Sequence, residues 1–435
     1  MSNTAADFYE EFLKKPESIY RPHPYTDAPW PGWEKDEEII PPVYLEEVLE
    51  IVNARNKKKS CDAHGLCNFM FNFLPIPYWC LLLKTFNWSF SEARLPLAWK
   101  DVRMLLLAKK ESLCAPALTK PISLLDIFLK IDEKLFLTRF RDMIHKRGLL
   151  PDTQSGFREK FRLQTRVLLF LEQVAALMAN SSPVATIFVD FRSAFDQLWF
   201  EGCLGKLRRM GIPKSFLNWI EAWLVNRRAY IEIKGEKSRW FPIDRGGPQG
   251  SIFTPTLFIT YHSDLTGFLN ICSSYLFADD LAAVLGGRIG DKFTSQCIDL
   301  EKRLKRFLDD LEFYSILTVQ PINLTKTEAL WSARAIGPPK FDIRCCNYWE
   351  RYLAALSDSV DGELLIEQAN LNQWRKAWLQ KELSIKGLYR SKRYVQHRSV
   401  LEKCVQWCSS NRSSYSIIDY DIRDIDLLGE FPDTF

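Results

Sequence analysis

The sequence lacks an apolar run long enough to cross a bilayer. Its most apolar stretch, Phe69–Leu83, is short and is interrupted by Asn72, Pro75 and Pro77, whereas a membrane-spanning helix needs about 20 apolar residues. Internal repeats, low-complexity segments and a secretory signal pattern are also missing. We therefore expect an intracellular globular protein, located in the nucleus, the cytoplasm or both, with no membrane partner.

Histidine is scarce, and cysteine follows no regular spacing. The chain has five histidines and eleven cysteines. Cys61, His64 and Cys67 lie close together, as do Cys404 and Cys408, yet neither group has a recognised zinc spacing. Scattered cysteines without a disulfide framework are typical of reduced intracellular proteins. We expect these cysteines to be structural.

A strong excess of one charge is missing as well. The net charge is +4 and the pI is near 8.4, which permits a nucleic-acid partner without arguing for one. Basic residues nevertheless cluster, and each cluster fits a solvated face as well as a phosphate contact. The clusters are Lys57–Lys59, Lys109-Lys110, Arg158–Arg162, Arg208-Arg209, Arg227-Arg228 and Lys386–Arg398.

The 435 residues are enough for two or three domains. Residues 1–40 are rich in Pro, Trp and acid and predict an extended N-terminal arm, and long polar helices follow Pro338. Between them, alternation predicts strands over Ala185–Phe191 and Tyr275–Leu285 and a hairpin in Tyr230–Ile243. Helical periodicity covers Pro41–Asn56, Leu124–Arg147, Leu163–Asn180, Phe200–Arg227 (with a turn at Gly211–Pro213), Ile252–Leu265 and Ile298–Tyr314.

Three carboxylates carry the most chemical information. Asp190 ends an apolar strand pattern, and Asp279-Asp280 follows about 90 residues later inside another. An Asp pair by itself is usually a turn feature. Two Mg²⁺ ions held by such oxygen ligands, however, stabilise both the attacking and the leaving oxygen of a phosphoryl transfer. The surrounding motifs decide between the two interpretations.

The motifs occur in a fixed order. Asp190-Phe-Arg-Ser-Ala-Phe-Asp196, Gly247-Pro-Gln-Gly-Ser-Ile252 and Phe277-Ala-Asp-Asp280 form a series that resembles the reverse transcriptases of non-LTR (LINE-type) retrotransposons. The match covers roughly residues 40–335. Supporting strings are Pro121–Leu125 with Lys130 and Glu133-Lys134, then Gln154-Ser-Gly-Phe-Arg158, Gly211-Ile-Pro213 and Asn323-Leu-Thr-Lys-Thr-Glu328.

The resemblance implies an α+β, right-hand polymerase fold. Fingers and a palm with an antiparallel sheet would occupy residues 41–335, and a helical thumb residues 336–435. The implied activity is RNA-directed DNA polymerisation, in which a nucleotidyltransferase adds deoxynucleotides to a primer 3′-hydroxyl. The partners would be an RNA template, a DNA primer and dNTPs, and the cofactors two Mg²⁺ ions, with Mn²⁺ as an alternative. The oligomeric state stays open.

Catalytic roles follow from the same resemblance. Asp190 and Asp279 match the two metal ligands, and Asp280 matches a supporting one. Lys326 matches a lysine that protonates pyrophosphate as a general acid. A solvated lysine is the competing interpretation for that position.

Substrate-binding roles follow in the same way. Phe195 stands where the family has an aromatic that excludes a ribose 2′-hydroxyl, which selects deoxynucleotides by clash. Arg158 matches an arginine that contacts the triphosphate. Gly247–Gly250 would let the backbone approach the templating base pair, and Gln249, which can donate and accept, suits a contact to template or nucleotide. Lys120 is assigned to template phosphates or nucleotide. A core Phe at 195 and a plain turn at Gly247–Gly250 are the alternatives.

Some positions depart from the family pattern. Lys120 replaces the usual Arg, Phe161–Thr165 replaces a small Ser-Thr element, and Tyr352–Ala354 is only a weak match to the primer-grip motif. The alternative hypothesis is therefore a catalytically decayed element remnant that binds nucleic acid without polymerising. A polymerase of another family is a third hypothesis. With no endonuclease or zinc-knuckle pattern present, we expect the polymerase portion of an element protein or a truncated reading frame.

Overall fold

The computed structural model describes residues 1–17, 19, 23–28, 38–54, 60–108 and 115–332. The helices are α1 (Ser2–Phe12), α2 (Leu45–Asn53), α3 (Ile76–Glu92), α4 (Leu129–Lys146), α5 (Leu163–Ala179), α6 (Phe200–Arg209), α7 (Lys214–Leu224), α8 (Thr254–Tyr261), α9 (Leu265–Phe268) and α10 (Phe293–Thr318). The strands are β1 (Asp101–Ala108), β2 (Thr119–Leu125), β3 (Val184–Val189), β4 (Arg227–Ile233), β5 (Glu236–Lys237), β6 (Phe241–Ile243), β7 (Ser273–Phe277), β8 (Asp280–Gly286) and β9 (Glu328–Ser332). The predicted C-terminal part, residues 336–435, lies outside the described residues.

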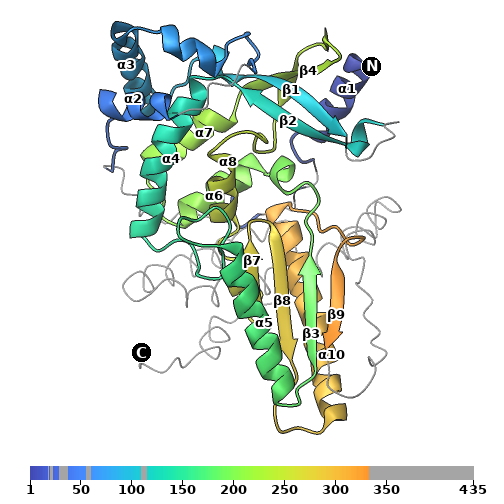
Figure 1. Cartoon of the computed structure of the whole chain (residues 1–435). Coiled ribbons are helices and arrows are strands. Elements are labelled where there is room, and N and C mark those ends of the chain that lie inside the picture. The colour runs from blue at the N-terminus through green and yellow to red at the C-terminus, as the bar shows by residue number, and fades with distance from the viewer. Residues whose placement is uncertain (18, 20–22, 29–37, 55–59, 109–114, 333–435) are drawn as a thin grey trace, which may run out of the picture.

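The strands form two sheets that lie at opposite ends of the described part (Figure 1). The first sheet has five strands in the order β2-β1-β4-β5, with β6 paired to β4. It is mixed, because β1 pairs antiparallel with β2 and parallel with β4. The mixture of helices and sheets agrees with the expected α+β class.

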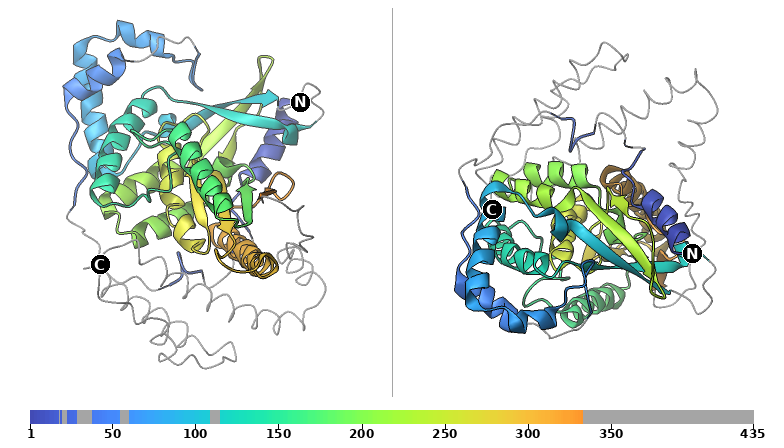
Figure 2. Two further views of the ribbon diagram at one scale, coloured as in Figure 1. Left: turned by 60° about the horizontal axis from the view of Figure 1, so that its bottom comes forward. Right: turned by 90° about the horizontal axis from the view of Figure 1, so that it is seen from above.

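Helix α1 packs against this first sheet, as the view from above shows (Figure 2). Ala5, Ala6 and Tyr9 are buried against strand residues such as Ile231 and Phe241. Small residues allow the helix to approach the strands closely, and the Tyr9 hydroxyl lies 2.7 Å from Thr119 Oγ1. The predicted extended arm is therefore wrong for Ser2–Phe12, where an apolar stripe at helical spacing finds a sheet to cover.

The second sheet has four antiparallel strands in the order β7-β8-β3-β9. Strand β3 is central, because its apolar residues pair with β8 on one side and β9 on the other. Helix α5 lies in front of the sheet and α10 behind it in Figure 1. Strands with both faces covered are rich in Val, Ile and Leu, and five of the six β3 residues are buried.

Aromatic packing fills the space between the two sheets. Phe136 of α4 stacks on Trp219 of α7 with ring centroids 3.6 Å apart, and Phe253 meets both rings edge-on. Such rings contribute large apolar areas and fixed geometry. The packed helices therefore hold the first sheet and the second sheet in a defined relation. None of the helices in the described part is long and apolar enough to cross a membrane.

A buried glutamate ties this core to the loop that precedes α8. Glu133 of α4 accepts hydrogen bonds from Trp223 Nε1 at 2.8 Å and from the Ile252 backbone N–H at 3.2 Å. Burial raises the pKa of Glu133. Because a buried acceptor needs its donors, Glu133 fixes one end of the Gly247–Ile252 loop.

Candidate active site

Two neighbouring strands bring the three carboxylates together. Val189 pairs with Leu281 in the antiparallel register of β3 and β8, so the next residue, Asp190, lies opposite Asp280. Phe277 pairs with Asp280, which leaves Ala278 and Asp279 as a two-residue turn. This confirms the strands and the tight turn predicted around the carboxylates.

The carboxylates repel one another. Burial raises the pKa of Asp279, and the neighbouring Asp280 and Asp190 carboxylates raise it further. Burial also raises the pKa of Asp280, with an added contribution from Asp190. Like charges held together in a partly buried place disfavour the ionised forms of Asp279 and Asp280. A bound cation would relieve this repulsion.

The donor set suits a metal that arrives with its substrate. Within the described ranges, no three His, Cys, Asp or Glu side chains form a preassembled metal cage. Mg²⁺, however, is usually held by one or two carboxylates and by substrate phosphates rather than by an all-protein cage. Asp190 and Asp279 therefore fit the hard oxygen chemistry that a nucleotide-bound Mg²⁺ requires.

Asp190 is further held by the segment before β9. Asn323 donates from Nδ2 to Asp190 Oδ2 at 2.6 Å and from its backbone N–H to the Asp190 carbonyl oxygen at 2.7 Å. Lys326 Nζ lies 3.9 Å from the same Oδ2 with a side chain that is 70% exposed. The structure thus places Lys326 beside Asp190. The sequence places Asn323 in a motif but does not predict its hydrogen bonds to Asp190.

Lys120, from the first sheet, acts electrostatically on Asp279. It lies on β2, paired with Leu107, and its side chain is exposed. Its positive charge opposes the rise in the pKa of Asp279. Electrostatic influence of this kind requires proximity. The first sheet therefore contributes a cation to a site whose carboxylates belong to the second.

Phe195 lies in a short 3₁₀ turn, Ala194–Gln197, which follows Asp190 closely in sequence. Its ring packs on Phe258 of α8 with centroids 4.9 Å apart, and it meets Phe157 edge-on at 6.3 Å. The side chain is half-buried. The ring is therefore fixed by packing on one side, while part of it stays accessible.

The Gly247–Ile252 loop docks on β2. Gly250 has φ +139°, and a Cβ there would lie 2.3 Å from the Ser123 carbonyl oxygen. The Ser123 N–H donates to the Gln249 carbonyl oxygen at 2.8 Å. The Gln249 side chain donates from Nε2 to Asp196 Oδ2 at 2.6 Å. The carboxamide predicted to contact template or nucleotide is therefore oriented by a second buried acid.

Two arginines, Arg158 and Arg166, have surroundings that the sequence did not predict. Arg158 donates from Nη1 to the carbonyl oxygens of Pro151 at 2.7 Å and Gln154 at 3.0 Å, and its guanidinium lies over the Phe161 ring at 4.0 Å. It is thus held by its own loop. Arg166 of α5, which sequence reasoning missed, lines the cavity that contains Asp190 and Asp280. Only tertiary packing brings that first-turn arginine to the site.

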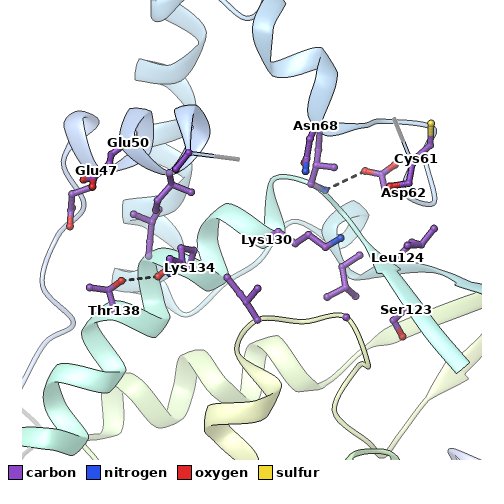
Figure 3. A pocket seen from close by; sticks show the side chains of 18 of the residues that line it. Glu47, Glu50, Cys61, Asp62, Asn68, Ser123, Leu124, Lys130, Lys134 and Thr138 are labelled. Atoms are coloured by element: carbon purple, nitrogen blue, oxygen red, sulfur yellow. Dashed lines mark hydrogen bonds between the residues drawn. The ribbon is translucent and has the colours of Figure 1, made fainter. Parts of the chain in front are cut away.

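Two cavities flank these residues. One of about 480 Å³ is lined by Asp190, Asp280, Lys326 and Arg166, with an apolar wall from α5 and β7. The other, of about 870 Å³, lies between α2, α4 and β2 and also touches Gly250. Figure 3 shows Lys130 of α4 extending across it toward Leu124 of β2. Its further polar lining includes Lys134, Thr138, Asn68 and Ser123.

The family model for reverse transcriptase (RNA-dependent DNA polymerase) matches residues 108–336, which is more than half of the 435-residue chain. The chain belongs to the reverse transcriptase family. This match contains all three carboxylates, the Gly247–Ile252 loop and Lys326. It confirms the family predicted from the ordered motifs.

Several relatives are polymerases of mobile elements. The chain is 27% identical over 297 residues to a probable RNA-directed DNA polymerase from transposon BS of Drosophila melanogaster, covering 66% of this chain and 32% of that protein. It is 29% identical to the RNA-directed DNA polymerase from mobile element jockey of the same species, covering 51% and 24%. It is 25% identical to a Pol polyprotein from type-1 retrotransposable element R2 of Nasonia vitripennis, covering 47% and 21%. The chain thus spans a third or less of the length of these relatives. Their names support the resemblance to non-LTR elements.

Proposed function

We propose that this chain carries out RNA-directed DNA synthesis. It would extend a DNA primer 3′-hydroxyl with dNTPs along an RNA template. The observation that supports this most directly is the meeting of Asp190, Asp279 and Asp280 at the ends of β3 and β8. In a member of the reverse transcriptase family, that arrangement fits phosphoryl transfer better than any other chemistry.

Asp190 and Asp279 are the proposed ligands of two Mg²⁺ ions, with Asp280 supporting them and Mn²⁺ as an alternative ion. When bound, the two ions would activate the primer hydroxyl and neutralise charge on the departing pyrophosphate. Asn323 keeps the Asp190 carboxylate oriented, because it bonds both its side chain and its backbone. Lys326 is the proposed proton donor to pyrophosphate, which its exposed position beside Asp190 supports.

The nucleotide is proposed to lie against Phe195, whose packed ring would clash with a 2′-hydroxyl. Gly250 lets the backbone approach the templating pair, and Gln249 is oriented there by Asp196. Besides Lys326, the cations proposed to contact phosphate oxygens are Lys120, which acts on the charge of Asp279, and Arg166, which lines the cavity of Asp190 and Asp280. Arg158 would join them only after leaving the Pro151 and Gln154 carbonyls.

The right-hand architecture follows from this assignment. The four-stranded sheet with α5 and α10 is the proposed palm, and the first sheet with α2, α3 and α4 the proposed fingers (Figure 1). The 870 Å³ cavity lies in these fingers and touches Gly250, so we place the incoming template strand there. Lys130 and Lys134 would bind its phosphates, since such contacts are sequence-independent and electrostatic.

Primer extension tests the proposal. Poly(rA) with oligo(dT), dTTP and Mg²⁺ is the substrate, and the wild-type chain is expected to extend the primer. Asp190→Ala and Asp279→Ala should each lower the rate at least about a hundredfold, because they remove electrostatic stabilisation of the transition state. Asp142→Ala, an exposed acid on α4 that pairs with Lys146, is the matched control and should extend normally. Equal extension by Asp279→Ala would refute the metal-site assignment.

One observation favours the alternative of a remnant that binds nucleic acid without polymerising. Arg158 donates from Nη1 to carbonyl oxygens of its own loop, which leaves that nitrogen unavailable to a triphosphate. Retained binding of an RNA–DNA duplex with no extension on RNA or DNA templates would support that alternative. Extension on DNA templates alone would indicate a polymerase of another specificity.

A further inference from the structure

The turn that carries Asp279 has an unfavourable backbone conformation. Ala278 has φ +62°, a left-handed value that a residue with a Cβ adopts only when its surroundings impose it. Asp279 follows immediately, so any rotation about Ala278 displaces the Asp279 carboxylate. Repulsion among the carboxylates also favours opening of the turn when no cation is bound.

Gln154 holds this residue from both sides. Its Oε1 accepts the Ala278 N–H at 2.9 Å, and its Nε2 donates to the Ala278 carbonyl oxygen at 2.9 Å. The same Oε1 accepts the Gly156 N–H at 2.7 Å, which fixes the rotamer. Gln154 is 2% exposed. A side chain so deeply buried is not available to substrate.

The backbone around Gln154 is matched to the turn as well. A Cβ on Gly156 would lie 2.1 Å from the Ala278 nitrogen and 2.7 Å from the Ala278 Cα. Both distances are too short for any residue with a side chain. The Ser155 N–H donates to the Leu276 carbonyl oxygen at 2.9 Å, and the Leu276 N–H donates to Thr153 at 3.0 Å. The segment thus lies along β7 like a short extra strand and brings the carboxamide to the turn.

We propose that Gln154 and Gly156 are positioning residues that hold the Ala278–Asp279 turn in its metal-binding conformation before substrate arrives. The proposal rests on the proposed function, because it concerns the same carboxylates. In the Gln154-Ser-Gly-Phe-Arg158 motif, Gln154 and Gly156 would thus shape the turn that carries Asp279 and would not contact nucleotide. Gln154 is joined to Ala278 by a pair of hydrogen bonds that only a carboxamide can make.

The test measures Mn²⁺ binding by the loss of the free-ion EPR signal, with the full chain and no nucleotide. Gln154→Ala should weaken Mn²⁺ binding at least tenfold while RNA–DNA duplex binding stays within twofold. Gln154→Glu, which keeps the volume but loses the donor to the Ala278 carbonyl, should weaken it similarly. Gln173→Ala is the matched control, because Gln173 bonds Ser273 and Tyr275 on the same hairpin but away from the turn. It should bind Mn²⁺ within twofold of wild type.

A double-mutant cycle separates positioning from general stability. Glycine adopts positive φ without strain, so in the Ala278→Gly background Gln154→Ala should weaken Mn²⁺ binding less than threefold. An equal loss in both backgrounds, or unchanged Mn²⁺ binding in Gln154→Ala, would overturn the proposal. If Gln154→Ala leaves Mn²⁺ binding unchanged but the wild-type chain extends primers, the proposed function stands and only the positioning role fails. If the cycle behaves as expected but no extension occurs, polymerisation fails and the positioning role stands.

Discussion

Replacing Glu133 by glutamine should destabilise the core between the two sheets and loosen the active-site loop. The carboxylate accepts from Trp223 Nε1 and from the Ile252 N–H, and it faces the buried Arg227. The Arg227 guanidinium lies over the Trp223 ring at 4.6 Å. Its nitrogens have no hydrogen-bond partner among the described residues, and burial lowers its pKa to about 10.

The cost follows from what glutamine cannot do. A carboxamide offers one acceptor oxygen, so one of the two donors faces an NH₂ group and loses its partner. A buried donor without an acceptor costs about 1–3 kcal/mol, and loss of the charge that compensates Arg227 adds to it. We expect Glu133→Gln to lower the free energy of unfolding by about 3 kcal/mol. Primer extension should fall as well, because Ile252 anchors the loop that carries Gln249 and Gly250.

Urea denaturation at pH 8, followed by tryptophan fluorescence, measures this loss. Glu221→Gln, an exposed glutamate on the same helix as Trp223, is the control and should change stability by less than about 0.5 kcal/mol. Adding Arg227→Met should recover part of the loss, since it removes the uncompensated charge. A cost below about 1 kcal/mol for Glu133→Gln, or no recovery in the double variant, would refute this account.

Three other outcomes follow from single contacts. Gly250→Ala should reduce extension at least tenfold, because its Cβ would meet the Ser123 carbonyl; full activity in a steady-state assay would contradict the docking of the loop. Phe195→Val should raise incorporation of ribonucleotides relative to deoxynucleotides, and unchanged discrimination in competition assays would exclude a steric role. Burial raises the pKa of the Asp126 carboxyl to about 6, so the folded state binds this proton more tightly than the unfolded state does. The free energy of unfolding should therefore fall by up to ~3 kcal/mol as pH rises from about 4 to 6. Asp126→Asn should flatten that dependence in denaturation measured across the range.

Local patterns were sufficient for the strands around the carboxylates. Alternation over Ala185–Phe191 and Tyr275–Leu285 is a property of neighbouring residues, and β3, β7 and β8 follow it. The predicted helix over Leu124–Arg147 begins only at Leu129. Thr119–Leu125 instead pairs along β1, and such pairing over distance overrides local propensity.

The sequence did not predict the contacts between distant segments. The pattern in Gln154–Arg158 predicts an arginine on the triphosphate, and that role stays a prediction. What the sequence did not indicate is that Arg158 is held by its own loop and that Gln154 bonds the Ala278–Asp279 turn. Gln249 is predicted to contact template or nucleotide, and the sequence did not indicate that its amide donates to Asp196. Side-chain direction depends on which partners the fold brings within hydrogen-bond distance.

The order and identity of the motifs are read from the sequence alone, and they place Asp190, Asp279 and Asp280 at the ends of predicted strands. Tertiary structure decided what holds them there. The left-handed Ala278 is bound by hydrogen bonds to Gln154 and closely packed against Gly156, and Lys120 acts on the charge of Asp279 from a strand of the other sheet. Backbone strain and charge repulsion at this site are local, whereas the contacts that offset them come from segments far apart in the chain.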